Sequence, residues 1–138
     1  MEKTARFAKL AVAWAIVIFV LSSIPGSSFP ASKLFSYDKL LHAAVYAVLG
    51  AFAFLSLRGW SSRASVLVLA AGAITTAYGF SDEFHQMFVP GRSADLRDVL
   101  ADCVGGFVGA LAASLVVATK VGASDKPDGP SVKSNHAS

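Results

Sequence analysis

The fold that we predict for this chain rests first on one apolar segment, Val99–Val117, "VLADCVGGFVGALAASLVV". Its only charged residue is Asp102, close to its beginning. A helix of about 20 predominantly apolar residues is long enough to cross a bilayer core of about 30 Å. Backbone groups in lipid have no water to bond with, so such a stretch is expected to be helical. We therefore predict that this stretch is a transmembrane helix.

Three more apolar blocks precede it, at roughly residues 7–24, 40–57 and 64–80. The chain has 138 residues, of which 54% are hydrophobic and only 15% charged, whereas a soluble domain has about 25% charged residues. Hydropathy therefore predicts an all-α, four-helix transmembrane bundle that lies in the lipid bilayer and spans residues 1–121. Residues 122–138 are polar and contain two prolines. This composition predicts a disordered cytoplasmic tail.

The first block also resembles a secretory signal peptide, because Lys3, Arg6 and Lys9 give it a basic start. Its apolar part is longer than the usual 7 to 15 residues and no clear A-x-A site follows, so we favour a retained helix. With a cytoplasmic N-terminus, the inner segments carry eight Lys and Arg residues and the outer segments four. The positive-inside rule thus predicts that both termini are cytoplasmic. The net charge of +3 then requires no nucleic-acid partner.

Charge is concentrated in Tyr78–Asp98, "YGFSDEFHQMFVPGRSADLRD", which holds four of the nine carboxylates. In the predicted topology this segment and the starts of the second and fourth helices share the outer side. Residues three or four apart lie on one helix face. The faces are Asp38, His42 and Tyr46 on the second helix; Tyr78, Asp82 and Gln86 on the third, with His85 beside them; and Asp98, Asp102, Gly105 and Gly109 on the fourth. We expect the two acids of the fourth helix to face the bundle interior, and its two glycines to form a helix-packing contact.

Part of this charge has a purely structural explanation. Asp38 and Asp95 are suited to cap the second and fourth helices, with Asp98 at the third position of the latter. The pair Pro90-Gly91 fits the centre of a type II turn.

Capping does not explain Asp82 and Glu83, which lie near the C-terminal end of the third helix. There the helix dipole disfavours negative charge by about 0.3 to 1 kcal/mol. The candidate partners are Lys39, a protonated His42, Arg92 or a bound cation. We expect Arg92 to be the counter-charge of Glu83, because the Pro-Gly turn can fold it back over the helix end. The predicted pocket therefore comprises Asp38, Lys39, His42, Tyr46, Asp82, Glu83, Gln86, Arg92, Asp98 and Asp102.

The segments "DKLLHAAVY", "SDEFHQMFVPGRSADLRDVLAD" and "GGFVG" together resemble the VanZ-like family of small bacterial integral membrane proteins. The resemblance covers about residues 10–118. The matching residues are Asp38, Lys39, His42, Tyr46, Asp82, Glu83, Gln86, Pro90, Gly91, Arg92, Asp98, Gly105 and Gly109. Asp102 stands where the family has asparagine. The family is named for a member that gives low-level resistance to the glycopeptide teicoplanin. The resemblance therefore implies that the protein lies in the bacterial cytoplasmic (inner) membrane and acts at the cell envelope. It also implies a role in antibiotic resistance.

The residues leave two main classes of function open. One is a non-enzymatic envelope protein that binds a lipid-linked or glycopeptide-type ligand in its outward-facing pocket. The other is a membrane enzyme that acts on lipid headgroups or cell-wall precursors. In the enzyme, Asp82, Glu83, Asp98 and Asp102 could hold a divalent cation, His42 could act as acid or base, and Arg92 could hold a phosphate.

A proton or ion path is the weakest alternative, because the charge lies near one surface and the first helix has no ionisable group at mid-depth. The sequence leaves the cofactor, any metal and oligomerisation open.

Overall fold

The computed structural model describes residues 1–28 and 38–124. It contains the helices α1 (Glu2–Ser22), α2 (Asp38–Leu57), α3 (Ala64–Gln86) and α4 (Leu96–Ser124), and a short 3-10 helix, η1 (Gly26–Ser28), after α1. All four α-helices are long and apolar enough to cross a membrane. The prediction of an all-α bundle of four transmembrane helices is confirmed.

Two helices extend well beyond the apolar blocks. Helix α3 continues past Phe80 to Gln86, so that Asp82 and Glu83 lie in its last turns. Helix α4 begins at Leu96 and continues to Ser124, past the predicted domain boundary at residue 121. The rest of the predicted tail, residues 125–138, lies outside the described residues.

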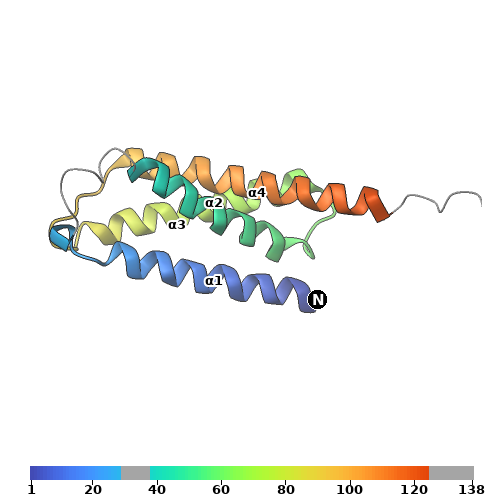
Figure 1. Cartoon of the computed structure of the whole chain (residues 1–138), viewed down its shortest axis with the longest axis horizontal. Helices are drawn as coiled ribbons and strands as arrows, with labels where there is room; N and C mark the ends of the chain where they lie inside the picture. Colours follow the sequence, from blue (N-terminus) through green and yellow to red (C-terminus); the bar gives the residue numbers. More distant parts are fainter. Residues whose placement is uncertain (29–37, 125–138) are drawn as a thin grey trace, which may run out of the picture.

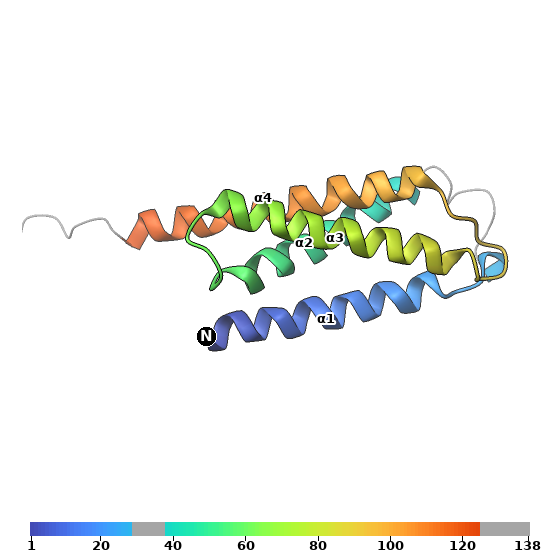
Figure 2. The ribbon, with the colours of Figure 1, turned by 180° about the vertical axis from the view of Figure 1, so that it is seen from behind.

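The four helices run side by side along the long axis of the molecule (Figures 1 and 2). Helix η1, the start of α2, the end of α3 and the start of α4 share one end of the bundle, which we call the polar end. The N-terminus of α1, the loop of residues 58–63 and the end of α4 lie at the opposite end. Helices α2 and α4 form the most extensive contact, and α1 lies at the margin against α2 and α3.

Glycine makes the crossing of α2 and α4 very close. A Cβ atom on Gly105 would overlap the carbonyl of Ala43, and one on Gly109 would overlap the carbonyl of Ala47. Small residues that allow such backbone contact supply the packing that holds membrane helices together, since lipid provides no hydrophobic driving force between them. The crossing therefore fixes the register of the two helices that carry most of the polar residues.

Side-chain bonds attach α1 to its neighbours. The indole Nε1 of Trp14 donates a hydrogen bond to the carbonyl of Val45 at 2.9 Å. The hydroxyl of Tyr78 donates to the carbonyl of Ala15 at 2.6 Å. Ile18 is buried against α2 beside Tyr46 and Leu49.

Two local features of the sequence set the loop between α3 and α4. The amide of Arg92 donates to the carbonyl of Val89 at 3.1 Å, and Gly91 has a φ of 74°, which confirms the type II turn. The Oδ1 atom of Asp95 accepts the amide of Arg97 at 2.8 Å, which confirms that Asp95 caps α4. The side chain of Asp38, which begins α2, lies outside the described part of the chain.

Candidate functional site at the polar end

Four carboxylates are buried at the polar end of the bundle. Asp82 and Glu83 from α3 are each 4% exposed, while Asp98 and Asp102 from α4 are 6% and 0% exposed. Large apolar residues of the same helices, such as Phe84 on α3 and Leu100 on α4, are exposed instead. Ionisable groups at such positions are costly and usually mark function.

Lys39 is the counter-charge for the acids at the start of α4. Its ammonium group lies 3.0 Å from Oδ2 of Asp95 and also forms an ion pair with Oδ1 of Asp98. The hydrogen bond from the amide of Arg97, together with Lys39, lowers the pKa of Asp95 below its ordinary value. Lys39 was one of the predicted partners of the α3 acids, but the structure assigns it to α4 and the preceding loop.

His42 forms a pair with the fully buried Asp102. Its Nδ1 atom lies 2.9 Å from Oδ1 of Asp102, and its side chain is 13% exposed. A carboxylate in this position fixes the orientation of the imidazole ring and favours the tautomer with a proton on Nδ1. Asp102 is therefore in contact with another predicted site residue.

The structure corrects the predicted pairing of Glu83 with Arg92. The Oε2 atom of Glu83 accepts the amide of Asp95 at 2.8 Å. The guanidinium group of Arg92 donates instead to the carbonyls of Ile24, at 3.2 Å, and Leu21, at 3.4 Å. The last carbonyls of a helix find no N–H donor within the helix, so a nearby arginine can bond them. Leu21 lies in the last turn of α1, and Ile24 lies just after it.

Arg92 bonds the end of α1 because α1 lies beside the turn that carries Arg92. The amide of Gly26 donates to the carbonyl of Pro90 at 3.1 Å. This bond joins the segment after α1 to the Pro-Gly turn and brings Arg92 to the end of α1. His85 faces α1 as well, with Nε2 2.9 Å from the hydroxyl of Ser23. Spacing rules within one helix contain no information about such a neighbour.

A pocket of about 150 Å³ lies between α1, α2 and α3. Its walls are formed by Ile18, Leu21, Ser22, Leu41, His42, Val45, Tyr46, Asp82, Gln86 and Arg92. Half of this lining was predicted as site residues: His42, Tyr46, Asp82, Gln86 and Arg92. The α1 residues and the apolar residues of α2 were missed, because nothing in the sequence placed α1 beside the polar segments.

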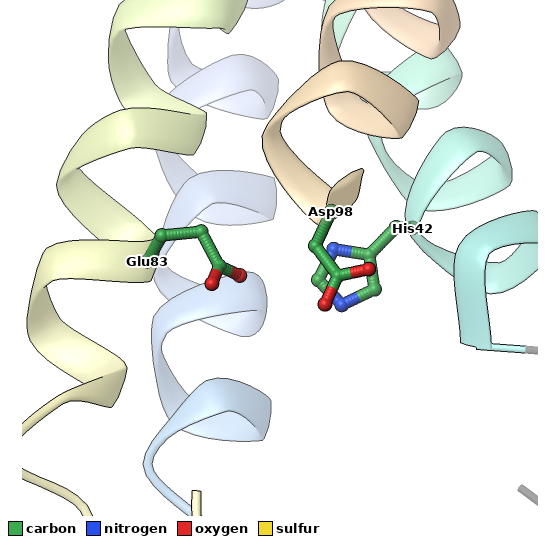
Figure 3. Close-up of side chains that lie close together, drawn as sticks. All are labelled: His42, Glu83 and Asp98. Carbon is green, nitrogen blue, oxygen red and sulfur yellow. The ribbon is translucent and has the colours of Figure 1, made fainter. Parts of the chain in front are cut away.

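Four other predicted site residues, all within the part of the chain that the structure describes, do not line this pocket. Lys39, Glu83, Asp98 and Asp102 lie further toward α4, and His42 belongs to both groups. His42, Glu83 and Asp98 each offer one ligand atom, and these atoms lie within 4.8 Å of one another. Figure 3 shows Glu83 extending from α3 toward Asp98 and His42. These three residues could hold a metal ion.

Several buried polar atoms at the polar end have no hydrogen-bond partner among the described residues. They are the hydroxyl of Tyr46, Oδ1 of Asp82, Oε1 of Glu83 and Oδ2 of Asp102. The other carboxylate oxygen of Asp82, Oδ2, accepts a hydrogen bond from the side-chain Nε2 of Gln86 at 3.1 Å. Buried polar atoms are nearly always bonded in native proteins, so each exception requires an explanation such as a water, an ion or a ligand.

These features define the class of protein: a multi-pass integral membrane protein with a polar site buried at one end of a helical bundle. The family model described as VanZ/LLP1 matches residues 7–117. The chain therefore belongs to the VanZ/LLP1 family, which confirms the resemblance found in its motifs. No curated protein and no solved structure shows significant similarity to it.

Proposed function

We propose that this protein binds a lipid-linked ligand at the outer face of the bacterial cytoplasmic membrane. The observation that carries the proposal is the pocket between α1, α2 and α3. Its apolar wall includes Ile18, Leu21 and Leu41, and its polar wall includes Tyr46 and Arg92. A lipid-linked molecule has the same division, with an acyl or prenyl chain joined to a polar headgroup.

The polar wall suits a headgroup that contains both a phosphate and hydroxyl groups. A guanidinium group presents its N–H donors in a planar fork that matches phosphate oxygens. That of Arg92 lies at the pocket wall, where two of its nitrogens also bond the carbonyls of Ile24 and Leu21. The buried hydroxyl of Tyr46 is an additional donor, and Oδ1 of Asp82 is an acceptor for a ligand hydroxyl; neither atom has a hydrogen-bond partner among the described residues. Such a ligand would therefore satisfy buried atoms that are costly in its absence.

Size favours a lipid headgroup over a glycopeptide as the occupant. The pocket measures about 150 Å³, whereas sites for drug-sized molecules are typically about 300 to 1,000 Å³. A role in glycopeptide resistance, which family resemblance suggests, would then be indirect, through a lipid-linked envelope molecule. Teicoplanin itself serves as the competing ligand in the test.

Ligand retention by the purified chain tests this proposal. Protein purified in detergent is incubated with phosphatidylglycerol, with diacylglycerol and with teicoplanin, and bound molecules are measured by native mass spectrometry. We expect retention of phosphatidylglycerol, whose headgroup has a phosphate and hydroxyls, and at least tenfold weaker retention by the Arg92→Gln variant. Arg97→Gln is the matched control, because Arg97 is exposed and does not line the pocket.

Three results would contradict the proposal. Equal retention of diacylglycerol would show that the phosphate is not recognised. Equal losses in Arg92→Gln and Arg97→Gln would show that only general surface charge matters. Retention of teicoplanin in place of lipid would favour direct binding of the antibiotic.

The outward orientation of the polar end is also a proposal, supported by the distribution of Lys and Arg. Cysteines introduced at the exposed positions Ser93 and Ser62, in a chain whose Cys103 is replaced by Ala, report it. In intact cells an impermeant thiol reagent should label the cysteine at 93 and not the one at 62. The reverse pattern would place the site on the cytoplasmic side.

The pair of His42 and Asp102 favours a second candidate function, a membrane enzyme acting on lipid headgroups or cell-wall precursors. His42 lines the pocket, and an imidazole oriented by a carboxylate is a common general base. An enzyme would change the headgroup of retained phosphatidylglycerol with time, and His42→Gln would abolish the change. A bound lipid whose mass stays constant over hours would exclude this activity on that lipid.

A further inference from the structure

Three different helices bring one candidate metal ligand each to the polar end. His42 comes from α2, Glu83 from α3 and Asp98 from α4, with their ligand atoms within 4.8 Å of one another (Figure 3). Glu83 and Asp98 are 4% and 6% exposed. An ion between them would contact all three helices of the tightly packed part of the bundle.

The Oε1 atom of Glu83 provides an observation that is independent of this clustering. It is buried and has no hydrogen-bond partner among the described residues, although Oε2 of the same carboxylate accepts the amide of Asp95. A carboxylate oxygen in this condition requires a cation or a donor that the surrounding side chains do not supply. Its carboxylate extends toward Asp98 and His42 (Figure 3).

Asp102 stands in the position of a supporting residue for a metal-bound histidine. It contacts Nδ1 of His42 at 2.9 Å and is fully buried. Histidines that ligate metals almost always donate their other ring N–H to a carboxylate, a carbonyl or a water. In this arrangement coordination would use Nε2, and Asp102 would hold the ring.

The charges of the described residues also favour a cation. Asp82, Glu83, Asp98 and Asp102 are all buried, and the ammonium of Lys39 contacts only Asp98 among these four. A bound divalent ion would offset part of the remaining negative charge. It would also share Asp98 with Lys39, since a carboxylate has two oxygen atoms.

We propose that His42, Glu83 and Asp98 bind a divalent first-row transition ion such as Zn²⁺, with Asp102 as the positioning residue for His42. The mixed nitrogen and oxygen donors favour such an ion over Ca²⁺ or Mg²⁺, which prefer oxygen ligands alone. This donor set differs from the four acids expected from the sequence, because Asp82 bonds Gln86 and lines the pocket. The proposal is independent of lipid binding.

Calorimetric titration of the full, detergent-purified chain with Zn²⁺ after dialysis against EDTA tests the proposal. We expect a saturable site whose affinity falls at least tenfold in His42→Gln and in Glu83→Gln. Loss of supporting residues typically costs about 10- to 100-fold in metal affinity, so Asp102→Ala should fall in that range. Lys39→Met should bind more tightly, since a competing positive charge is removed.

Two matched controls separate this site from other binding. His85→Gln removes a histidine at the same end that contacts Ser23, and it should leave the affinity unchanged. Arg92→Gln should also keep full Zn²⁺ affinity, so that failure of lipid binding and failure of metal binding remain distinguishable. The absence of a saturable site, or the same affinity in every variant, would overturn the proposal.

If His42→Gln does not fold, X-ray absorption by Zn²⁺ bound to the His85→Gln chain identifies the ligands of the ion directly. The proposal requires scattering from an imidazole ligand together with carboxylate oxygens. An ion coordinated by oxygen alone would contradict it.

Discussion

The two ends of the bundle differ in whether their charged residues are buried or exposed. At the polar end, four carboxylates are buried between helices and some of their oxygens have no partner. At the opposite end, Arg58 and Arg63 are exposed, and the hydrogen bonds of the connecting loop are local, such as that from the amide of Trp60 to the carbonyl of Leu57. The loop that joins α2 to α3 at this end thus connects two helices without a buried charge. The buried charge at the polar end is therefore not a requirement of building a four-helix bundle.

Substitution of glycine should give the largest difference in stability between the two ends. A side chain on Gly109 would overlap the backbone of Ala47, whereas Gly59, in the loop at the opposite end, has open space around it. We expect Gly109→Leu to destabilise the bundle by at least about 3 kcal/mol, the upper part of the range for overpacking. Gly59→Leu should have little effect. The comparison is measured as thermal unfolding in detergent, and equal midpoints for the two variants would refute the close crossing.

Removal of a basic residue should have the next largest effect. Lys39→Met leaves Asp98 buried without its ion pair, so we expect a loss of about 2 kcal/mol, between the values for exposed and buried pairs. Arg58→Met removes a charge that is exposed and should change stability by less than about 0.5 kcal/mol. Chemical or thermal unfolding of the two variants side by side gives the difference. Similar small changes in both would mean that Lys39 is not the counter-charge of Asp98 in the membrane.

Glu83→Gln should change stability by a smaller amount, and it should stabilise the protein where the two preceding substitutions destabilise it. The glutamine oxygen can still accept the amide of Asp95, and its NH₂ group replaces the oxygen that has no partner. We expect a gain of about 1 kcal/mol in stability, because a buried charge is removed without loss of this bond. The exposed Glu2 supplies the control, Glu2→Gln. A clear loss of stability on Glu83→Gln would show that the charge of Glu83 is structurally compensated.

The smallest expected value is the coupling between Glu83 and Arg92. Because each bonds a different partner, we expect the effects of Glu83→Gln and Arg92→Gln on unfolding to add within about 0.5 kcal/mol. A double-mutant cycle measures this term. A coupling above about 1 kcal/mol would restore the direct pairing that the sequence suggested.

Hydropathy and helical spacing predicted the parts of the structure that depend on one helix at a time. The four spans follow from continuous apolar blocks, and the inward positions of Asp98 and Asp102 follow from their spacing relative to Gly105 and Gly109. Asp95 could be identified as a cap because its contact is with its own helix.

Contacts between helices were less predictable. The pairing of Lys39 with Asp98 depends on the register of α2 against α4, which backbone contacts at the glycines determine. The position of Arg92 depends on where α1 ends in space. Neither quantity is contained in the spacing of residues along one chain segment, so the partners of the buried acids had to come from the structure.

The contact of Gly105 and Gly109 with α2 also determines how the bundle can deform. A slide of α4 along α2 would bring backbone atoms into collision, so we expect these two helices to move together. Helix α1 makes no such glycine contact along its own length. Bonds such as Trp14 to Val45 and Arg92 to Ile24 join it to its neighbours through a side chain of one partner and a carbonyl of the other. We therefore expect the easiest motion to be a displacement of α1 relative to this helix pair, which would widen or narrow the pocket wall formed by Ile18 and Leu21.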